Sequence, residues 1–456
     1  MPSCRTLSYL NNGIRVKKEE EVFNLHILKI IHGYPQKYNA GSEVYSQSIC
    51  NELSKKHTIS IFTREENTFE KDFHIREISE SNKTIYYLNI PREKDGYRHN
   101  KLDEEFQRLI ENLRPDIAHI GHLNHLSTGL VDILNQNNIP IVFTLHDFWL
   151  MCPRGQFLQT NFGNENFYQL CDSQENSKCA LNCYKGLFSG IDEDFERDLK
   201  YWSSWIHTRM LETKSISRKV NLFIAPSTYL MNRFINEFGI DRNKIIYLDY
   251  GFPLHYLKPN KKKKTNPKFT FGYIGTHIPA KGVHLLIEAF LTITSDAALK
   301  IWGRENGQNT SSLKELVEKS GKQSRIEWMG EYINTNIADL VFSEVDCIVV
   351  PSIWGENSPL VIHEAQACHI PVITANYGGM SEYVQHEVNG LLFDHRNTMD
   401  LAEKMNYAVQ NQEWMKVLGQ RGYLFSENGN VPNIENHCIE LEKIYNRTLD
   451  EFNEST

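Results

Sequence analysis

A chain of 456 residues is too long for one hydrophobic core, so two domains of roughly 200 residues each are expected. Apolar residues make up 40% of the chain and charged residues 23%, which is typical of a globular protein and not of a disordered one. The net charge of −8 argues against a nucleic-acid binder, and no apolar run reaches the roughly 18 residues of a membrane span.

In chain order, residues 1–22 predict a flexible polar segment, and an N-terminal domain is expected over 23–255. Strand-like apolar runs alternate there with amphipathic stretches, which predicts a parallel sheet flanked by helices. The alternation breaks over 152–220, so we expect a cysteine-bearing insertion there. The expected strands of this domain are Leu25–Ile31, Thr58–Phe62, Thr84–Leu88, Asp116–Ile120, Ile139–Leu145, Leu222–Ala225 and Lys244–Leu248.

The second half repeats the pattern after a linker, expected over 256–268 because prolines and four consecutive lysines gather there. A C-terminal α/β domain should span 269–420, and 421–456 predict a helical tail able to pack back on the N-terminal domain. Two doubly wound domains imply a ligand cleft at the carboxyl ends of their strands. The expected strands of the second domain are Phe269–Gly275, Leu299–Gly303, Arg325–Met329, Cys347–Pro351 and Pro371–Thr374.

One segment, Ser352 to Glu364, follows a buried strand and opens a helix. Ser358 suits the N-cap and Pro359 the first helical position. The free amides of Leu360 and Val361, with the helix dipole, then form an anion site suited to a diphosphate.

Two carboxylates flank this helix start. Glu356 precedes the helix and Glu364 lies within it, so one can contact sugar hydroxyls while the other accepts hydrogen bonds from a ribose diol. The alternative is a solvated glutamate pair on an ordinary helix. The preceding strand, the proline start and Gly378-Gly379 on the next loop favour the ligand site.

These residues belong to a longer pattern that resembles the signature of family-4 retaining glycosyltransferases (glycosyl transferases group 1). That family has the GT-B architecture, in which two Rossmann-like domains face each other across a cleft. The pattern comprises Ala225-Pro226-Ser227, Gly275, Ala280-Lys281-Gly282-Val283, Leu285-Leu286, Glu288-Ala289-Phe290, Glu356 to Ala365, Pro371-Val372-Ile373, Gly378-Gly379, Glu382 and Asn389 to Phe393.

The resemblance implies transfer of a sugar from a UDP-, GDP- or ADP-linked donor to an acceptor hydroxyl, with no catalytic metal. Glu364 would bind the donor ribose, Glu356 the transferred sugar, and Lys281 would neutralise the departing diphosphate. The other implied donor-binding residues are Gly41, Ser42, Gly275, Asn357, Ser358, Pro359, Leu360 and Val361.

The sequence departs from the family at two loops. Thr276 stands where members commonly carry an arginine after the glycine, and Arg304 on a neighbouring loop is the candidate replacement. In the glycine-rich loop, Gly41-Ser42 replaces two adjacent glycines.

Polar residues at strand ends complete the expected site. The resemblance places His146 against the transferred sugar, and the carboxyl end of its strand should face the cleft; a hydrogen-bonded structural histidine is the alternative. We assign His119, His122 and Asp147 to the acceptor side.

Cys152, Cys171, Cys179 and Cys183 are candidate ligands of a structural zinc, although only Cys179 and Cys183 have a typical short spacing. Reduced packing thiols are the alternative. Because no secretion signal is apparent, we expect a cytoplasmic protein, with peripheral attachment to a membrane left open.

Two other functions stay open from the sequence alone. A hydrolysing epimerase of the same fold would turn over the donor without an acceptor. A non-catalytic nucleotide-sugar or metal-binding protein would have kept the fold without the reaction, and Thr276 and the cysteines favour it.

Overall fold

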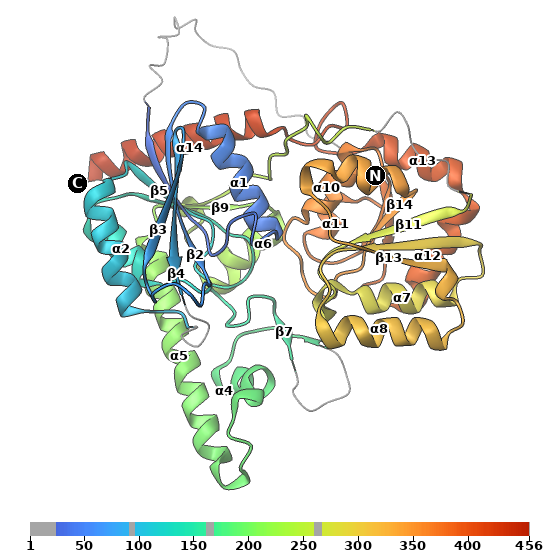
Figure 1. Cartoon of the computed structure of the whole chain (residues 1–456), viewed down its shortest axis with the longest axis horizontal. Helices are drawn as coiled ribbons and strands as arrows, with labels where there is room; N and C mark the ends of the chain where they lie inside the picture. Colours follow the sequence, from blue (N-terminus) through green and yellow to red (C-terminus); the bar gives the residue numbers. More distant parts are fainter. Residues whose placement is uncertain (1–23, 91–95, 161–167, 260–266, 456) are drawn as a thin grey trace, which may run out of the picture.

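The computed structural model describes residues 24–90, 96–160, 168–259 and 267–455. The expected flexible segment 1–22 and most of the expected linker lie outside these ranges. Two α/β domains stand side by side, as the sequence predicted, with the N-terminal domain in blue to green and the C-terminal domain in yellow to orange (Figure 1).

The N-terminal domain is built on an eight-stranded sheet with the order β10-β9-β6-β5-β1-β2-β4-β3. All neighbouring strands pair in parallel except β3 and β4, which form an antiparallel edge. The strands are β1 His26–Ile30, β2 Thr58–Glu65, β3 Ile75–Glu80, β4 Lys83–Asn89, β5 Ile117–Ile120, β6 Ile141–Thr144, β9 Leu222–Ala225 and β10 Ile245–Tyr247.

The C-terminal domain holds a six-stranded parallel sheet with the doubly wound order β13-β12-β11-β14-β15-β16. The switch point, where the strand order reverses, falls between β11 and β14. The loops after these two strands therefore open onto the ligand-binding edge. The strands are β11 Phe269–Ile274, β12 Ala297–Trp302, β13 Ile326–Gly330, β14 Cys347–Val350, β15 Val372–Ala375 and β16 Gly390–Phe393.

Helices cover both sheets, and the apolar faces between sheet and helices form the core of each domain. The N-terminal domain has α1 Gly41–Leu53, α2 Asn100–Leu113, α3 Gly129–Gln136, α5 Phe195–Lys219 and α6 Thr228–Arg233. The C-terminal domain has α7 Val283–Thr292, α8 Gly307–Lys319, α9 Ile337–Leu340, α10 Leu360–Ala367, α11 Met380–Tyr383, α12 Thr398–Gln410 and α13 Gln412–Arg421.

The chain crosses between the domains twice. The last helix, α14 (Ile434–Ser455), returns to the N-terminal domain, where it packs against α1 and runs along the upper edge in Figure 1. Its side chains bond to that domain: Tyr45 to His437 at 2.8 Å, and Lys56 to Glu442 at 3.2 Å. The two crossings pair with each other, because Phe252 N donates to Pro432 O at 2.9 Å.

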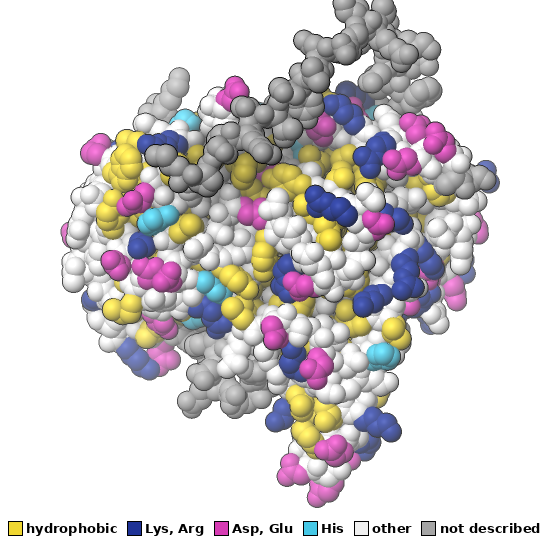
Figure 2. Space-filling view, turned by 180° about the vertical axis from the view of Figure 1, so that it is seen from behind, with side chains coloured by type: hydrophobic (Ala, Val, Ile, Leu, Met, Phe, Trp, Pro, Cys, Tyr) yellow, Lys and Arg dark blue, Asp and Glu magenta, His cyan; other side chains and the backbone are white. Residues whose placement is uncertain are grey.

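The segment 152–220 projects from the N-terminal domain. It contains the short strands β7 (Leu158–Gln159) and β8 (Gln169–Leu170), the helix α4 (Asn176–Cys179) and the long α5. In Figures 1 and 2, α4 and the start of α5 extend below both domains, whereas the end of α5 packs against α3, and Arg396 Nη2 of the C-terminal domain donates to Tyr168 O at 2.6 Å. In the ranges described above, no helix combines the length and the apolar character needed to cross a membrane.

The sequence pattern did not predict β3. Most of its residues are exposed, so the strand shows no buried alternation, and its pairing partner β4 lies next to it in the chain. An exposed edge strand carries little hydrophobic signal.

Candidate active site

A cavity of about 380 Å³ lies between the two domains, at the carboxyl ends of both sheets. Its floor comes from the loops after β11 and β14 and the start of α10, and its opposite wall from the loops after β1, β5 and β6. The two switch points thus face each other, as expected for a ligand site between doubly wound domains.

The loop after β14 holds Glu356 in a fixed position. One carboxylate oxygen, Oε1, accepts hydrogen bonds from Lys281 Nζ at 2.6 Å, Ser352 Oγ at 2.7 Å and Trp354 Nε1 at 3.0 Å. The Glu356 side chain is only 8% exposed. Three donors at a buried carboxylate hold its orientation without help from a ligand.

Lys281 ends a short turn, Pro279–Lys281, after β11. Gly282 follows with a φ of 69°, and a Cβ there would lie 1.8 Å from the carbonyl oxygen of Pro351. Only glycine tolerates both the left-handed conformation and this approach. It therefore brings the Lys281 turn against the β14 loop and its ammonium group to Glu356.

The helix α10 starts one residue later than expected. Pro359 takes the N-cap position, and no side chain caps the helix. Ser358 is therefore not the cap, because its hydroxyl donates to Asp249 at 3.1 Å instead. The first amides, at Leu360 and Val361, have no partners inside the helix, and both residues line the cavity.

Glu364 lines the cavity one turn inside α10. Burial raises the pKa of its carboxyl to about 7, and the neighbouring His363 opposes this only in part. Tyr332 also lines the cavity, and burial raises the pKa of its hydroxyl. The negative charge of Glu364 raises that pKa further. A carboxylate with a raised pKa gains from hydrogen-bond donors, such as those of a diol.

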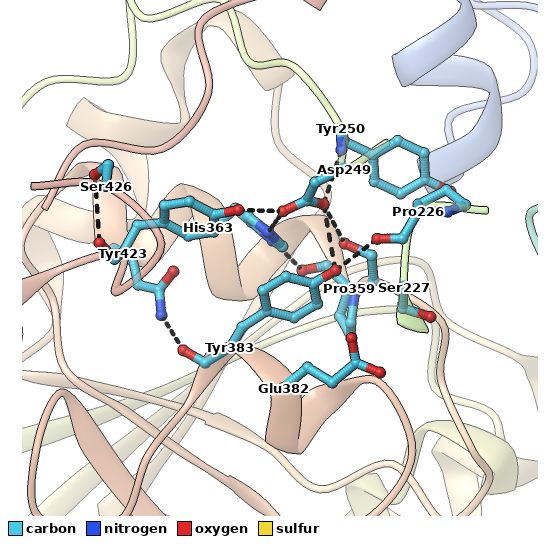
Figure 3. Close-up of polar contacts among 12 residues, drawn as sticks. Pro226, Ser227, Asp249, Tyr250, Pro359, His363, Glu382, Tyr383, Tyr423 and Ser426 are labelled. Atoms are coloured by element: carbon cyan, nitrogen blue, oxygen red, sulfur yellow. Dashed lines mark hydrogen bonds and ion pairs between the residues drawn. The ribbon is translucent and has the colours of Figure 1, made fainter. Parts of the chain in front are cut away.

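Beneath this loop, Asp249 collects a network of polar contacts (Figure 3). Its Oδ2 lies 3.0 Å from His363 Nε2 and accepts from Tyr423 at 2.7 Å, while its Oδ1 accepts from Ser358 and from Tyr383. Burial alone would raise the pKa of Asp249, but the His363 contact and the hydrogen bonds outweigh it and lower the pKa. The network ties α10 to the end of the N-terminal sheet.

Asn357 links the domains at the cavity. Its Oδ1 accepts from Ser227 at 2.7 Å, and its amide group donates to Leu145 O at 3.2 Å and Tyr250 at 3.3 Å. Gly379 packs so closely on this loop that a Cβ would lie 1.4 Å from the Asn357 carbonyl oxygen. The loop is therefore fixed from both sides.

The N-terminal wall contains His146. Its Nδ1 lies 2.6 Å from the Tyr250 hydroxyl, and the two rings stack. Burial, with the nearby charge of Lys29 and His122, lowers the pKa of His146 well below its usual value, so the imidazole is neutral at neutral pH. A neutral imidazole can both donate and accept hydrogen bonds.

Gly41 and Ser42 line the cavity at the start of α1, and Gly275 and Thr276 line it at the end of β11. His122 and Asp147 also lie on the N-terminal wall, with His122 Nε2 3.3 Å from the Asp147 carboxylate.

Two expected site residues do not reach this cavity. His119 is fully buried between Tyr445 of α14, at 2.6 Å, and Thr144, at 2.7 Å, so it is a structural residue. Arg304 lies on the loop beside Thr276, where its carbonyl accepts from His277 at 3.0 Å, but its side chain is exposed and does not line the cavity. Among the described lining residues, Lys281 is the single lysine or arginine.

Family models match both halves of the chain. A model of glycosyltransferase family 4 covers residues 40–254, and a model of glycosyl transferases group 1 covers residues 257–425. The chain belongs to the family-4 glycosyltransferases.

Curated relatives match parts of this chain. An uncharacterized glycosyltransferase of Methanocaldococcus jannaschii is 34% identical over 160 residues, which is 35% of this chain and 44% of the relative. A D-inositol 3-phosphate glycosyltransferase of Rhodococcus opacus is 25% identical over 235 residues, 48% of this chain and 52% of the relative. The chain thus matches about half the length of these relatives.

Solved structures match the fold over nearly the whole chain. Sucrose-phosphate synthase of Thermosynechococcus elongatus has a TM-score of 0.68 at 18% identity, covering 94% of this chain and 100% of that one. Anabaena HepE in complex with UDP and glucose has a TM-score of 0.64 at 15% identity, with 93% and 100% covered. The chain therefore has the GT-B architecture.

Several residues that line the cavity were not predicted from the sequence. Tyr250 follows β10 as His146 follows β6. Polar residues at the carboxyl ends of parallel strands face the cleft, so the position of Tyr250 in the sequence also indicates a lining residue. His32 follows β1 in the same way, and its Nε2 lies 3.3 Å from Glu43. The other missed lining residues are Asn39, Ala40, Val44, Asn124, Gln156, Ile274, Tyr332, Asn334 and Trp354.

The four cysteines of the projecting segment do converge. Cys152, Cys171, Cys179 and Cys183 all line one cavity of about 10 Å³. Burial raises the pKa of the Cys179 thiol to about 12 and that of Cys183 to about 11. Within the described ranges, no three His, Cys, Asp or Glu side chains are placed to hold a metal ion, so structural zinc stays a prediction of the sequence.

Proposed function

We propose that this chain transfers a sugar from a nucleotide-diphosphate sugar to an acceptor hydroxyl, with retention of the anomeric configuration and without a metal ion. The observation that carries the proposal is one cavity lined by Lys281, Glu356, Glu364 and the amide end of α10. These groups match a donor with a ribose diol, a diphosphate and a sugar ring.

In the proposed binding mode, Glu364 accepts hydrogen bonds from the ribose, and the diphosphate lies at the amides of Leu360 and Val361. Glu356 and His146 orient the transferred sugar. Two features support this mode: Glu364 lies one turn beyond those amides, and Glu356 precedes them on the same loop.

The proposed reaction breaks the bond between the anomeric carbon and the diphosphate oxygen and forms a bond to the acceptor oxygen on the same face. The acceptor proton passes to the leaving phosphate oxygen. Negative charge grows on that oxygen in the transition state, where the Lys281 ammonium and the helix amides stabilise it. With Thr276 in place of the family's arginine, the proposal gives Lys281 the main cationic role.

The proposal is tested by thermal unfolding with UDP, GDP and ADP and their glucose, mannose, galactose and N-acetylglucosamine derivatives. A ligand at a hundredfold over its dissociation constant stabilises a protein by about 2.7 kcal/mol, which is readily measured as a higher Tm. We expect one nucleotide to raise the Tm of the wild type and to lose this effect in Glu364→Ala. A folded protein with no response to any nucleotide would refute the proposal.

Turnover then separates transfer from hydrolysis. The donor identified by binding is incubated with and without candidate acceptors, and the nucleoside diphosphate and sugar products are measured. Rapid donor consumption without any acceptor would favour a hydrolysing enzyme. The anomeric configuration of the product, read by NMR, tests retention.

A further inference from the structure

A second and larger cavity, of about 520 Å³, adjoins the donor cavity. The two cavities share three lining residues, Asn124, Asp147 and Gln156, so they form adjacent compartments of one cleft. The volume lies within the roughly 300–1,000 Å³ typical of small-molecule sites. The wall of the second cavity comes largely from the segment 152–220, which the proposed donor site leaves without a role.

Aromatic side chains make up one wall of this second cavity. Helix α5 places Trp202, Trp205 and Arg209 on one face, because residues three and four apart on a helix lie side by side. The Trp202 ring stacks on Tyr184 at 5.3 Å, and the Trp205 ring meets Tyr97 edge-on at 5.2 Å. Both tryptophans are half-buried, so each has ring surface left for a ligand.

Buried contacts hold this wall in place. Arg209 is almost fully buried, lies 4.5 Å over the Trp149 ring and donates to the Trp149 carbonyl at 2.7 Å. The Trp202 and Trp205 rings also pack against each other at 5.7 Å. The aromatic wall is therefore formed before any ligand binds.

Polar groups lie where the two cavities meet. Asp147 accepts a hydrogen bond from Trp149 N at 2.7 Å, and its side chain keeps 29% of its surface exposed. Gln156 and Asn124 are half-buried beside it. Ala280, the residue before Lys281, closes the cavity from the C-terminal domain.

We propose that this aromatic cavity binds the acceptor and that the acceptor is a saccharide. A sugar ring has C–H groups on its faces, which suit the electron-rich faces of tryptophan, and hydroxyls at its edge, which suit Asp147 and Gln156. A saccharide on Trp202 and Trp205 extends a hydroxyl past Asp147 toward Lys281. This inference rests on the proposed transferase function and adds the acceptor class to it.

The test uses the full-length chain, saturated with the nucleoside diphosphate that raises its Tm, on an array of free and lipid-linked mono- to tetrasaccharides. Saccharides that bind are then titrated in solution by calorimetry, because the variants remove tryptophans and would change a fluorescence signal directly. The variants are Trp202→Ala and Trp205→Ala, with Trp205→Phe to keep an aromatic ring. Trp414→Ala is the matched control, because Trp414 lies on α13, lines neither cavity and is 37% exposed.

We expect Trp202→Ala and Trp205→Ala to weaken saccharide binding about tenfold each, as for a buried aromatic contact worth more than about 1 kcal/mol. Trp205→Phe should keep most of the affinity, and Trp414→Ala should keep all of it. The dissociation constant of the nucleoside diphosphate should change less than about twofold in every variant.

Other outcomes overturn the inference. It fails if the nucleotide-bound protein binds no saccharide, or if the alanine variants bind the saccharide as well as the wild type does. It also fails if they lose nucleotide affinity to the same degree, since the change would then be a general loss of structure. If no nucleoside diphosphate binds in the first place, the proposed transferase function itself fails, which distinguishes the two failures.

Discussion

Lys281→Met gives the sharpest test of the proposed mechanism. Among the described residues that line the cavity of the proposed donor site, Lys281 is the single lysine or arginine, so the substitution removes the one lysine or arginine charge among them. Removing one preorganised donor to a developing negative charge typically lowers kcat about 10²–10³-fold, or about 2.7–4 kcal/mol. With Thr276 in place of a second cation, we expect the upper end of that range.

The same substitution should change stability much less. Glu356 keeps its hydrogen bonds from Ser352 and Trp354 after Lys281 is lost. Lys281 is 35% exposed, so solvent already screens the ion pair. We therefore expect the free energy of unfolding to fall by only about 1–2 kcal/mol.

Release of nucleoside diphosphate from the identified donor measures the activity, and urea unfolding measures the stability. Lys314→Met is the matched control, because Lys314 pairs with Glu305 at 2.7 Å and is 39% exposed but lies outside the cavity. The control should change activity less than about twofold. A loss of less than about threefold in Lys281→Met, or an equal loss in Lys314→Met, would refute the role given to Lys281.

Three further predictions concern the surrounding structure. Because the pKa of Glu364 is raised to about 7, its ionised fraction falls from about 90% to about 10% between about pH 8 and pH 6. Nucleotide affinity, measured by calorimetric titration, should therefore weaken about tenfold from about pH 8 to pH 6. In Glu364→Gln the affinity should not change over this pH range. Gly282→Ala should lower the free energy of unfolding, measured with urea, by about 2 kcal/mol or more, because the added Cβ would clash with the Pro351 carbonyl oxygen. Gly239 also has a positive φ, of 86°, but open space around it, so Gly239→Ala should lower the same free energy by about 1 kcal/mol. Asp249→Asn should lower the free energy of unfolding by about 3 kcal/mol at neutral pH, because it breaks the buried contact between Asp249 and His363. Because folding lowers the pKa of Asp249, its stabilisation is present above the pKa of the unfolded state. That stabilisation is lost as the pH falls through the pKa of the folded state. A cost unchanged between neutral pH and about pH 3 would contradict that account.

The sequence predicted the parts of the site that depend on local pattern. Glu356, Glu364 and Lys281 lie in short segments whose strand, turn and helix signals are contiguous in the chain. The alternation of apolar strands and amphipathic helices was likewise enough to predict two parallel sheets.

The sequence did not reveal which distant residues Ser358 and His119 contact. Ser358 has the chemistry of an N-cap, but Asp249, which is distant in the chain, takes its hydroxyl. His119 lies inside β5, whereas His146 follows β6, and α14 returns from the far end of the chain and buries His119 against Tyr445. Neither Asp249 nor Tyr445 can be recognised as a partner from the local sequence, because tertiary packing decides these contacts.

The convergence of the four cysteines also depends on contacts between residues that are distant in the chain. Only Cys179 and Cys183 are close in sequence, and the short β7–β8 pair brings Cys171 to Cys152. The aromatic wall was missed for a related reason. Trp202 and Trp205 indicate one face of a helix, but only the fold reveals that this face borders the donor cavity.

The paired crossings between the domains have a consequence for motion. Phe252 and Asn433 form a parallel bridge, so the two connecting segments are bonded to each other. They must bend together as a single hinge, and rotation about any axis away from this pair would break their hydrogen bonds. A hinge motion about this pair would also have to break the Ser227–Asn357 hydrogen bond, which joins the domains at the cavity.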